Sequence, residues 1–317
     1  MISLNGDIVN IGSFPNGECY CDIDSDKVKC NHNEFNFIEM RFENDEDILF
    51  LSFLKDYLDD LMPNKPCDLF MPYIPYSRMD RVEENRLFTL KYFAKIVNRL
   101  NFRRVVVMEP HSDVSSALID RIVVVNESDF LAKIAMRDSI GLVGDAWLKK
   151  DGFNDIGYNL ENLYNIAKNS GVYIVLPDYG AEKRYKKQID YPKILTCSKD
   201  RAFNDGKIRS TVIHGVENAR DCKIAIIVDD LCSKGGTFMG VADALRCEIP
   251  TIEKVVLCVT HCENNIFNGF VLSSNVIDMV YTTDSILNVR KNIQDYETYR
   301  NKFKIIDTSE VYLNVRV

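Results

Sequence analysis

Apolar and polar residues follow one another along the chain in blocks that predict alternating strands and helices. Short, β-branched apolar runs at 104–108, 172–176 and 224–228 are typical of strands buried on both faces. A further strand is expected at 68–74, whereas residues 45–61 and 88–100 repeat apolar side chains at helical spacing. This alternation predicts an α/β layer fold with a mostly parallel sheet, whose functional groups lie where the strands end.

The second half of the chain repeats the plan of the first, with further strands expected at 193–201, 254–260 and 279–283. Residues 141–154 hold glycines and charges without clear periodicity, and we expect the domain boundary there. The length of 317 residues also favours two domains. We therefore predict domains 1–145 and 146–317, with the last segment as a candidate for packing back on the first domain.

The stretch 223–240 holds the densest candidate chemistry. Its strand is expected to end at Asp229 and Asp230, which puts two carboxylates at a strand tip, suited to sugar hydroxyls or to magnesium held over them. A glycine-rich turn then leads into a helix predicted at 238–246, and its residues are Ser233, Lys234, Gly235, Gly236 and Thr237. Backbone N–H groups of such a turn, at a helix start, bind phosphate. The acidic pair alone, or the glycine-rich turn alone, is also common in proteins without such a site.

Taken together, this stretch resembles the phosphoribosyl-diphosphate (PRPP) binding signature of type I phosphoribosyltransferases and of ribose-phosphate pyrophosphokinases, the PRPP synthetases. Other motifs extend the resemblance to PRPP synthetases from Phe14 to about Thr283, in the same order and at similar spacing. The resemblance implies two similar type I phosphoribosyltransferase-like domains, each a mostly parallel sheet flanked by helices.

The resemblance also implies an ATP site in the first half. The turn 14–18 is a hairpin or loop by its composition, and it matches a family loop that reaches across a dimer interface to the adenine, with Asn16 in place of an acid. Residues 75–81 match a family segment that contacts ATP, with Met79 in place of a glutamine; on its own this could be a solvated charged loop. The candidate ATP-binding residues are Phe14, Asn16, Glu18, Arg78, Asp80 and Arg81.

Four further residues gain roles through the resemblance. His111 and Asp178 each follow a predicted strand, and they match the positions of the family's magnesium ligands. Lys199 and Arg201 stand two apart on a predicted strand, where side chains point the same way. They match a family pair that closes over the transferring diphosphate, so the resemblance implies that they are catalytic. Residues 202–206, which follow, have the composition of a mobile loop.

The implied reaction transfers the β,γ-diphosphate of ATP, with Mg²⁺, to the anomeric hydroxyl of a ribose and releases AMP. Ser233 and Lys234 replace an acid and a threonine of the family's phosphate loop, which makes this pocket more cationic. The acceptor therefore stays open between ribose 5-phosphate, which gives PRPP, and ADP-ribose, the proposed acceptor of some phage relatives that rebuild NAD. A type I phosphoribosyltransferase and a catalytically silent regulatory homologue are the alternative functions.

Charge and composition narrow the partners. The net charge of −8, without a long basic run, argues against nucleic-acid binding. The chain has no apolar segment long enough to span a membrane and its start lacks the features of a signal peptide, so we expect a cytoplasmic protein without membrane contact. A homo-oligomer, dimer-based and up to a hexamer, is implied by the resemblance alone.

The ten cysteines are scattered through apolar runs and are expected to be mostly small buried hydrophobic residues. Cys19, Cys21, Cys30 and His32 could supply four zinc ligands, but their spacing is not a familiar zinc pattern. We interpret them as strand and turn residues.

Overall fold

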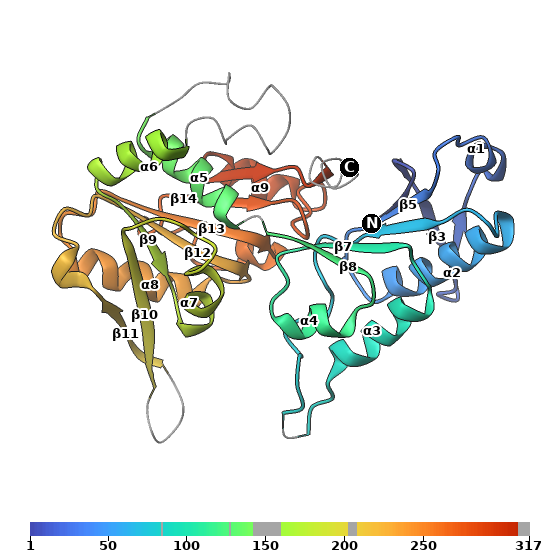
Figure 1. Ribbon diagram of the computed structural model, residues 1–317, viewed down its shortest axis with the longest axis horizontal. Helices are drawn as coiled ribbons and strands as arrows, with labels where there is room; N and C mark the ends of the chain where they lie inside the picture. Colours follow the sequence, from blue (N-terminus) through green and yellow to red (C-terminus); the bar gives the residue numbers. More distant parts are fainter. Residues whose placement is uncertain (84, 127, 142–159, 202–207, 310–317) are drawn as a thin grey trace. The chain divides into compact units, whose positions relative to one another are not determined.

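The computed structural model describes the chain except residues 84, 127, 142–159, 202–207 and 310–317. The described residues form two compact units, Met1–Val125 and Asn126–Val317 (Figure 1). Each unit contains one large, mostly parallel sheet with helices packed on it. The predicted fold class, an α/β protein of two units with parallel sheets flanked by helices, is confirmed.

The first unit is built on a six-stranded sheet with the order β2-β1-β5-β6-β7-β8. The last four of these strands in the order are mutually parallel, while β1 pairs antiparallel with both of its neighbours. The bounds of these strands are β1 Ile2–Leu4, β2 Asp7–Ile8, β5 Asn36–Met40, β6 Cys67–Phe70, β7 Arg104–Met108 and β8 Ile122–Val125. A separate antiparallel hairpin is formed by β3 (Asn10–Ser13) and β4 (Cys19–Asp22).

Helices α2 (Glu46–Leu61) and α3 (Thr89–Arg99) cover one face of this sheet. Their buried side chains, among them Leu54 and Phe93, belong to the same apolar cluster as Leu69 of β6. Both predicted helices are confirmed to within one residue at either end, because the helical spacing of their apolar residues matches the face that is buried. The shorter helices of this unit are α1 (Ser25–Lys29) and α4 (Asp113–Leu118).

The second unit is built on a seven-stranded sheet with the order β11-β10-β9-β12-β13-β14-β15. Only the edge pair β10–β11 is antiparallel. The strands are β9 Val172–Leu176, β10 Ile194–Arg201, β11 Ile208–His214, β12 Ile224–Cys232, β13 Lys254–Cys262, β14 Met279–Thr283 and β15 Phe303–Ile306. The helices are α5 Ser128–Ser139, α6 Leu160–Asn169, α7 Tyr179–Tyr185, α8 Gly236–Glu248 and α9 Ile293–Tyr299, with short 3-10 turns at Val216–Asn218, Asn264–Asn268 and Arg300–Lys302.

Both faces of the second sheet are covered, as the continuous apolar strands predict. Ile226 and Val228 face the cluster that contains α5 and α7, whereas Ala225 and Ile227 face the cluster that contains α8. Successive strand residues point to opposite faces, so a strand covered on both sides has no polar alternation. Its first polar side chains, Asp229 and Asp230, come near the end of β12.

The structural division lies between Val125 and Asn126, earlier than the predicted boundary at 141–154. The reason is α5, which packs on the second sheet: Asp138 accepts hydrogen bonds from Tyr281 of β14 at 3.1 Å and from Lys304 of β15 at 2.9 Å. The sequence of α5 does not indicate which of the two sheets this helix will pack against. Most of the predicted boundary, and the last segment at 310–317, lie outside the described residues.

Some strand ends also differ from prediction. β12 was expected to end before Asp229 but continues to Cys232, and β13 continues to Cys262, because Leu231 and Cys232 stay in register with His261 and Cys262. β6 ends at Phe70 rather than at residue 74. Proline at position 72 has no N–H to continue a ladder, which explains the shorter strand.

Candidate functional site

The carboxyl ends of β9 and β12 are neighbours in the second sheet, because the two strands are parallel and paired. Asp178 follows β9 and is the N-cap residue of α7, where its carboxylate oxygen accepts the N–H of Ala181 at 3.1 Å. Residues 177–184 thus form a turn that leads into α7. Capping fixes one oxygen of Asp178 at this sheet edge, next to the strand that carries Asp229 and Asp230.

Asp230 is 4% exposed and is paired with a cation. The nearest guanidinium nitrogen of Arg184, in α7, lies 2.7 Å from a carboxylate oxygen of Asp230. Burial lowers the pKa of Arg184, but Tyr185, Asp230 and Asp229 raise it more strongly, so the guanidinium stays charged. A buried carboxylate needs such a partner. Arg184 was not among the predicted site residues. The one sequence signal for it is that it is a basic residue in the segment that follows Asp178.

Asp229 has a different environment. It is half-buried, and its carboxylate accepts the N–H of Asp230 at 2.9 Å. Burial, and then the charge and hydrogen bonding of Asp230, hold the pKa of Asp229 well above its usual range. The nearby charge of Asp178 raises this pKa further, whereas Arg184 lowers it. The two adjacent acids are therefore chemically distinct, and Asp229 is the one that gains most from a hydroxyl or cation placed beside it.

The glycine-rich turn is held in one conformation by its surroundings. Gly235 has φ +79°, and a Cβ atom built on it would lie 2.1 Å from Cγ2 of Val271. A Cβ atom on Gly269 would lie 2.2 Å from the carbonyl oxygen of Lys234. Both positions therefore require glycine, the first for its φ as well as for the space.

The first turn of α8 is open to an anion. Its N-cap is Gly235, which offers no side chain to accept the N–H groups at the start of the helix. Ser233 and Thr237 are half-buried beside it, and Lys234 is exposed and has no ion-pair partner within the described part of the chain. Uncapped N–H groups, the helix dipole and a lysine together suit a phosphate group.

The predicted turn at 14–18 is confirmed as the loop of the β3–β4 hairpin. Its backbone is closed by Phe14 N–H to the carbonyl of Glu18 at 2.7 Å, and the side chain of Asn16 accepts the N–H of Glu18 at 3.1 Å. Phe14 is 54% exposed, with its ring 4.9 Å from that of Tyr20. The loop thus presents an aromatic ring, while one acceptor of Asn16 is used within the loop itself.

Arg78, Asp80 and Arg81 lie in the connection between β6 and α3. Arg78 is exposed and Asp80 is half-buried. Arg81 is exposed and its guanidinium lies 3.0 Å from Glu83 and 3.7 Å from Asp80. Such pairs are weak in water, so they leave Arg81 available to a stronger anion.

The two predicted metal ligands belong to different units. His111 is partly buried and follows β7 in the first unit, whereas Asp178 belongs to the second. Across the described residues, no three His, Cys, Asp or Glu side chains are grouped so as to hold a metal ion. Of the candidate zinc residues, Cys19 and Cys21 lie in β4, and Cys30 is the C-cap residue of α1.

Lys199 and Arg201 lie in β10, where the backbone of Lys199 is opposite Thr211 and that of Arg201 is opposite Ile208. The register shifts between Asp200 and Arg201, which is a bulge or similar irregularity. The expected mobile loop, 202–206, lies outside the described residues.

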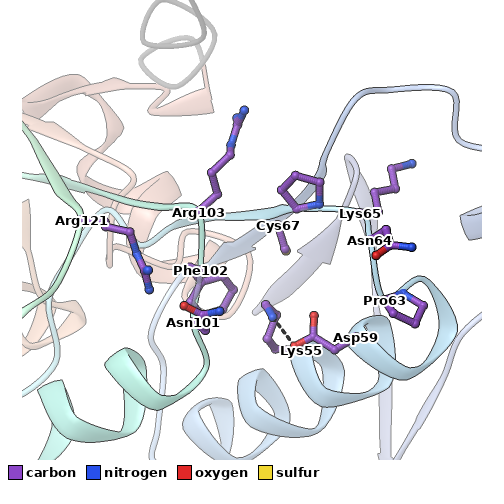
Figure 2. A pocket seen from close by; sticks show the side chains of 11 residues that line it. Lys55, Asp59, Pro63, Asn64, Lys65, Cys67, Asn101, Phe102, Arg103 and Arg121 are labelled. Carbon is purple, nitrogen blue, oxygen red and sulfur yellow. Dashed lines mark hydrogen bonds and ion pairs between the residues drawn. The ribbon is translucent and has the colours of Figure 1, made fainter.

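In the first unit, a pocket of about 530 Å³ lies at the amino ends of β6 and β7 (Figure 2). It is lined by cations, but Lys55 is paired with Asp59 at 2.5 Å and Arg103 with Asp68 at 2.7 Å. Arg103 and Arg121 extend in different directions (Figure 2). None of the predicted site residues lines this pocket, and its cationic side chains do not converge on one point.

Within the described residues, no helix is both long enough and apolar enough to cross a membrane.

The chain is similar to known proteins, although no family model matches it. It is 28% identical over 258 residues to a ribose-phosphate pyrophosphokinase from Fusobacterium nucleatum, a match covering 79% of this chain and 68% of the relative. Ribose-phosphate pyrophosphokinases from Mycoplasma genitalium and Ureaplasma parvum are each 24% identical, over 262 and 239 residues, with 79% and 71% of this chain covered. The matches cover 66% and 60% of these two relatives, so the chain spans roughly two thirds of its curated relatives.

The fold also has a solved counterpart. The crystal structure of phosphoribosylpyrophosphate synthetase from Mycobacterium smegmatis superposes with a TM-score of 0.64, covering 97% of this chain and 88% of that one, at 16% identity. At this identity the likeness shows the fold alone, while the curated relatives add similarity in sequence. The chain is therefore similar in sequence to ribose-phosphate pyrophosphokinases, and it shares the fold of a phosphoribosylpyrophosphate synthetase.

Proposed function

We propose that this chain is an ATP-dependent pyrophosphokinase that transfers the β,γ-diphosphate of ATP to the anomeric 1-hydroxyl of a 5-phosphorylated ribose and releases AMP. One observation carries the proposal: the acids Asp229 and Asp230, the glycine-rich turn and the uncapped start of α8 follow one another at the carboxyl end of β12. Similarity in sequence to ribose-phosphate pyrophosphokinases supports it.

Each part of this arrangement has a role in the proposed reaction. The turn 233–237 would bind the 5-phosphate, and Asp229 would accept hydrogen bonds from the ribose 2- and 3-hydroxyls, with Asp230 held behind it by Arg184. The 1-hydroxyl oxygen would form a bond to the β-phosphorus of ATP as the bond from that phosphorus to the α-phosphate oxygen breaks, and the hydroxyl would lose its proton. Such transfers depend on alignment and charge more than on covalent help.

The roles proposed for the residues that would bind ATP and neutralise the transferring diphosphate rest on the family resemblance. Lys199 and Arg201 would neutralise the transferring diphosphate. Phe14, Asn16 and Glu18 would bind the adenine end of ATP, and Arg78, Asp80 and Arg81 would bind or position its phosphates.

The residues present fit Mg²⁺. This ion takes oxygen ligands and usually keeps several waters, binding through one or two carboxylates and the phosphates of a substrate. Asp178 of the second unit would be a carboxylate ligand of the ion, and His111 of the first unit is the other ligand that the family resemblance implies. When bound, it would supply positive charge to the diphosphate oxygens.

A second acceptor, ADP-ribose, is favoured by one observation. Phe270 is 74% exposed, and its neighbours Gly269 and Val271 both touch the phosphate-binding turn, at Lys234 and Gly235. An exposed aromatic residue in the segment that contacts this turn would suit an acceptor that continues from its 5-phosphate into a second phosphate and a base. The product would then be ADP-ribose 1-pyrophosphate, a precursor for rebuilding NAD.

The deciding experiment measures AMP formed from Mg-ATP with ribose 5-phosphate and, separately, with ADP-ribose, and identifies the sugar product by mass. We expect AMP with at least one acceptor and a product heavier by one diphosphate. AMP with only one acceptor assigns the substrate. No AMP with either acceptor would contradict the proposal and favour a type I phosphoribosyltransferase or a silent regulatory homologue. We also propose that the protein is a homo-oligomer.

A further inference from the structure

The last residues of β12 and β13 are both cysteines. The two strands are parallel, and their register places Cys232 directly opposite Cys262. Neighbouring strands lie about 4.8 Å apart, and a disulfide usually joins Cα atoms that are about 4.4–6.8 Å apart. The register therefore gives these two cysteines the backbone spacing that a disulfide needs.

This pairing distinguishes the two residues from the other cysteines. All ten cysteines lie in the described part of the chain and are free thiols. Across the paired strands there, Cys232 and Cys262 are the two that face each other, and both are fully buried. Cys258 is also buried in β13, but Val228 and Tyr281 lie opposite it. Cys258 is therefore a small space-filling residue, whereas Cys232 and Cys262 form a dithiol.

The dithiol lies where the two strands pass into the glycine-rich turn and into the segment that packs on that turn. A Cβ atom built on Gly235 of the turn would lie 3.6 Å from the sulfur of Cys232. Cys262 is followed by Glu263, whose N–H donates to the carbonyl of Cys232 at 2.8 Å. The chain then continues to Val271, which packs against Gly235. A change in the distance between the two sulfurs would therefore reach the turn from both sides.

We propose that Cys232 and Cys262 form a disulfide when a peroxide oxidises them, and that this bond displaces the glycine-rich turn. A disulfide holds its sulfurs about 2.05 Å apart, well inside the contact distance of two thiols, so the strand ends must move toward each other. Close-packed interiors transmit such shifts. The disulfide itself goes beyond the proposed function, and only its effect on the sugar acceptor rests on that function.

The oxidation balances with hydrogen peroxide as the oxidant. The sulfur of Cys232 attacks one peroxide oxygen, the O–O bond breaks, and the leaving hydroxide takes the thiol proton to form water. Cys232 is then a sulfenic acid. The sulfur of Cys262 attacks the sulfur of Cys232, the S–O bond breaks, and the second hydroxide leaves as water with the proton of Cys262. Two thiols have been oxidised to one disulfide, and one peroxide has been reduced to two waters.

The surroundings assign the order of these steps. The hydrogen bond with Cys232, and then burial, raise the pKa of the Cys262 thiol. A buried thiol that keeps its proton reacts slowly, which suits Cys262 to the second step. Cys232 lies against the turn at Gly235, so local opening of the turn is what admits the peroxide to its sulfur.

The test treats the reduced whole chain with hydrogen peroxide, blocks the remaining thiols with iodoacetamide, and maps the digested peptides by mass. We expect a peptide that joins Cys232 to Cys262, is lighter by two hydrogens than its two reduced parts, and is separated by dithiothreitol. Cys258→Ala is the matched control and should still form this peptide. Cys262→Ala should not form it.

Hydrogen exchange measures the effect on the turn without any need for turnover. We expect amide exchange at 233–237 to differ at least about tenfold between the oxidised and the reduced chain, and to be unchanged by peroxide in Cys262→Ala. In the same samples, oxidation should raise the KM for the sugar acceptor about tenfold in the parent chain only.

Oxidation of the exposed Cys30 and Cys247 without the Cys232–Cys262 peptide would overturn the inference. A disulfide that left amide exchange in the turn unchanged would overturn the displacement of the turn. A chain that formed the disulfide and changed its exchange, yet released no AMP when reduced, would support this inference and contradict the proposed reaction alone.

Discussion

Arg184 and Asp230 form an ion pair of 2.7 Å with side-chain exposures of 20% and 5%. The pair joins the first helix after β9 to the end of β12, and so it fixes the position of one strand-tip acid relative to the other. Removing one partner of a buried pair leaves an uncompensated charge, which costs more than the pair contributes. The integrity of this sheet edge should therefore depend on Arg184.

For Arg184→Met we expect a loss of about 3 kcal/mol in the free energy of unfolding, measured by urea denaturation. Arg184→Lys keeps the charge and should recover part of the loss, and any activity it retains should show a raised KM for the sugar acceptor. Lys187→Gln, on an exposed residue after the same helix, is the control. Equal stability of Arg184→Met and the control would show that the pair does not hold Asp230.

Gly235→Ala should damage the glycine-rich turn for two separable reasons. The residue has φ +79°, which costs a non-glycine residue about 1–2 kcal/mol, and the added methyl group overlaps Val271. We expect a total loss of about 3 kcal/mol or more by thermal or urea unfolding. The added Val271→Ala change removes the overlap, so the double variant should be less unstable than the sum of the single variants.

Gly236→Ala is the matched comparison, because a Cβ atom on Gly236 would meet nothing within 4 Å and its φ is not positive. It should unfold within about 0.5 kcal/mol of the parent chain. If Gly235→Ala were equally benign, the turn would not have the rigidity described here.

Some of these features could be predicted from sequence and others could not. The runs 104–108, 172–176 and 279–283 are strands at the predicted bounds, because continuous apolar residues determine which segments can be buried on both faces. The order of the acidic pair and the glycine turn was also visible. Partnerships across the fold were not: Arg184 became a site residue only because the end of β9 lies beside β12. Likewise, nothing in the sequence marked the register shift after Asp200.

Asp68 predicts a pH dependence of stability. It is buried and accepts hydrogen bonds from Arg103 at 2.7 Å and from Arg104 at 2.9 Å. Burial alone would raise the pKa of Asp68, but these two arginines outweigh it and the pKa is lowered. A carboxyl with a folded-state pKa below its unfolded value stabilises the fold above the unfolded pKa, near 3.9, and loses that contribution as the pH falls through the folded pKa.

We therefore expect Asp68→Asn to be less stable than the parent chain by about 2 kcal/mol at pH 7. That difference should hold down to about pH 5 and shrink below about pH 4. Urea denaturation at several pH values measures it. Asp7→Asn is the control, since the pair of Asp7 with Lys27 is exposed on both sides. A difference that did not change with pH would indicate lost packing rather than a lost charge.

The pair Lys199 and Arg201 is the most direct test of the proposed chemistry. If both neutralise the transferring diphosphate, Lys199→Ala and Arg201→Ala should each lower kcat by at least about a hundredfold, because charge developed in the transition state would be left uncompensated. Lys193→Ala is the control: this lysine precedes the same strand, and its ammonium group pairs with Asp221 at 2.5 Å. Its loss should affect stability and leave kcat within about threefold. Turnover that stayed within about threefold, or 0.7 kcal/mol, in both strand variants would remove Lys199 and Arg201 from the mechanism.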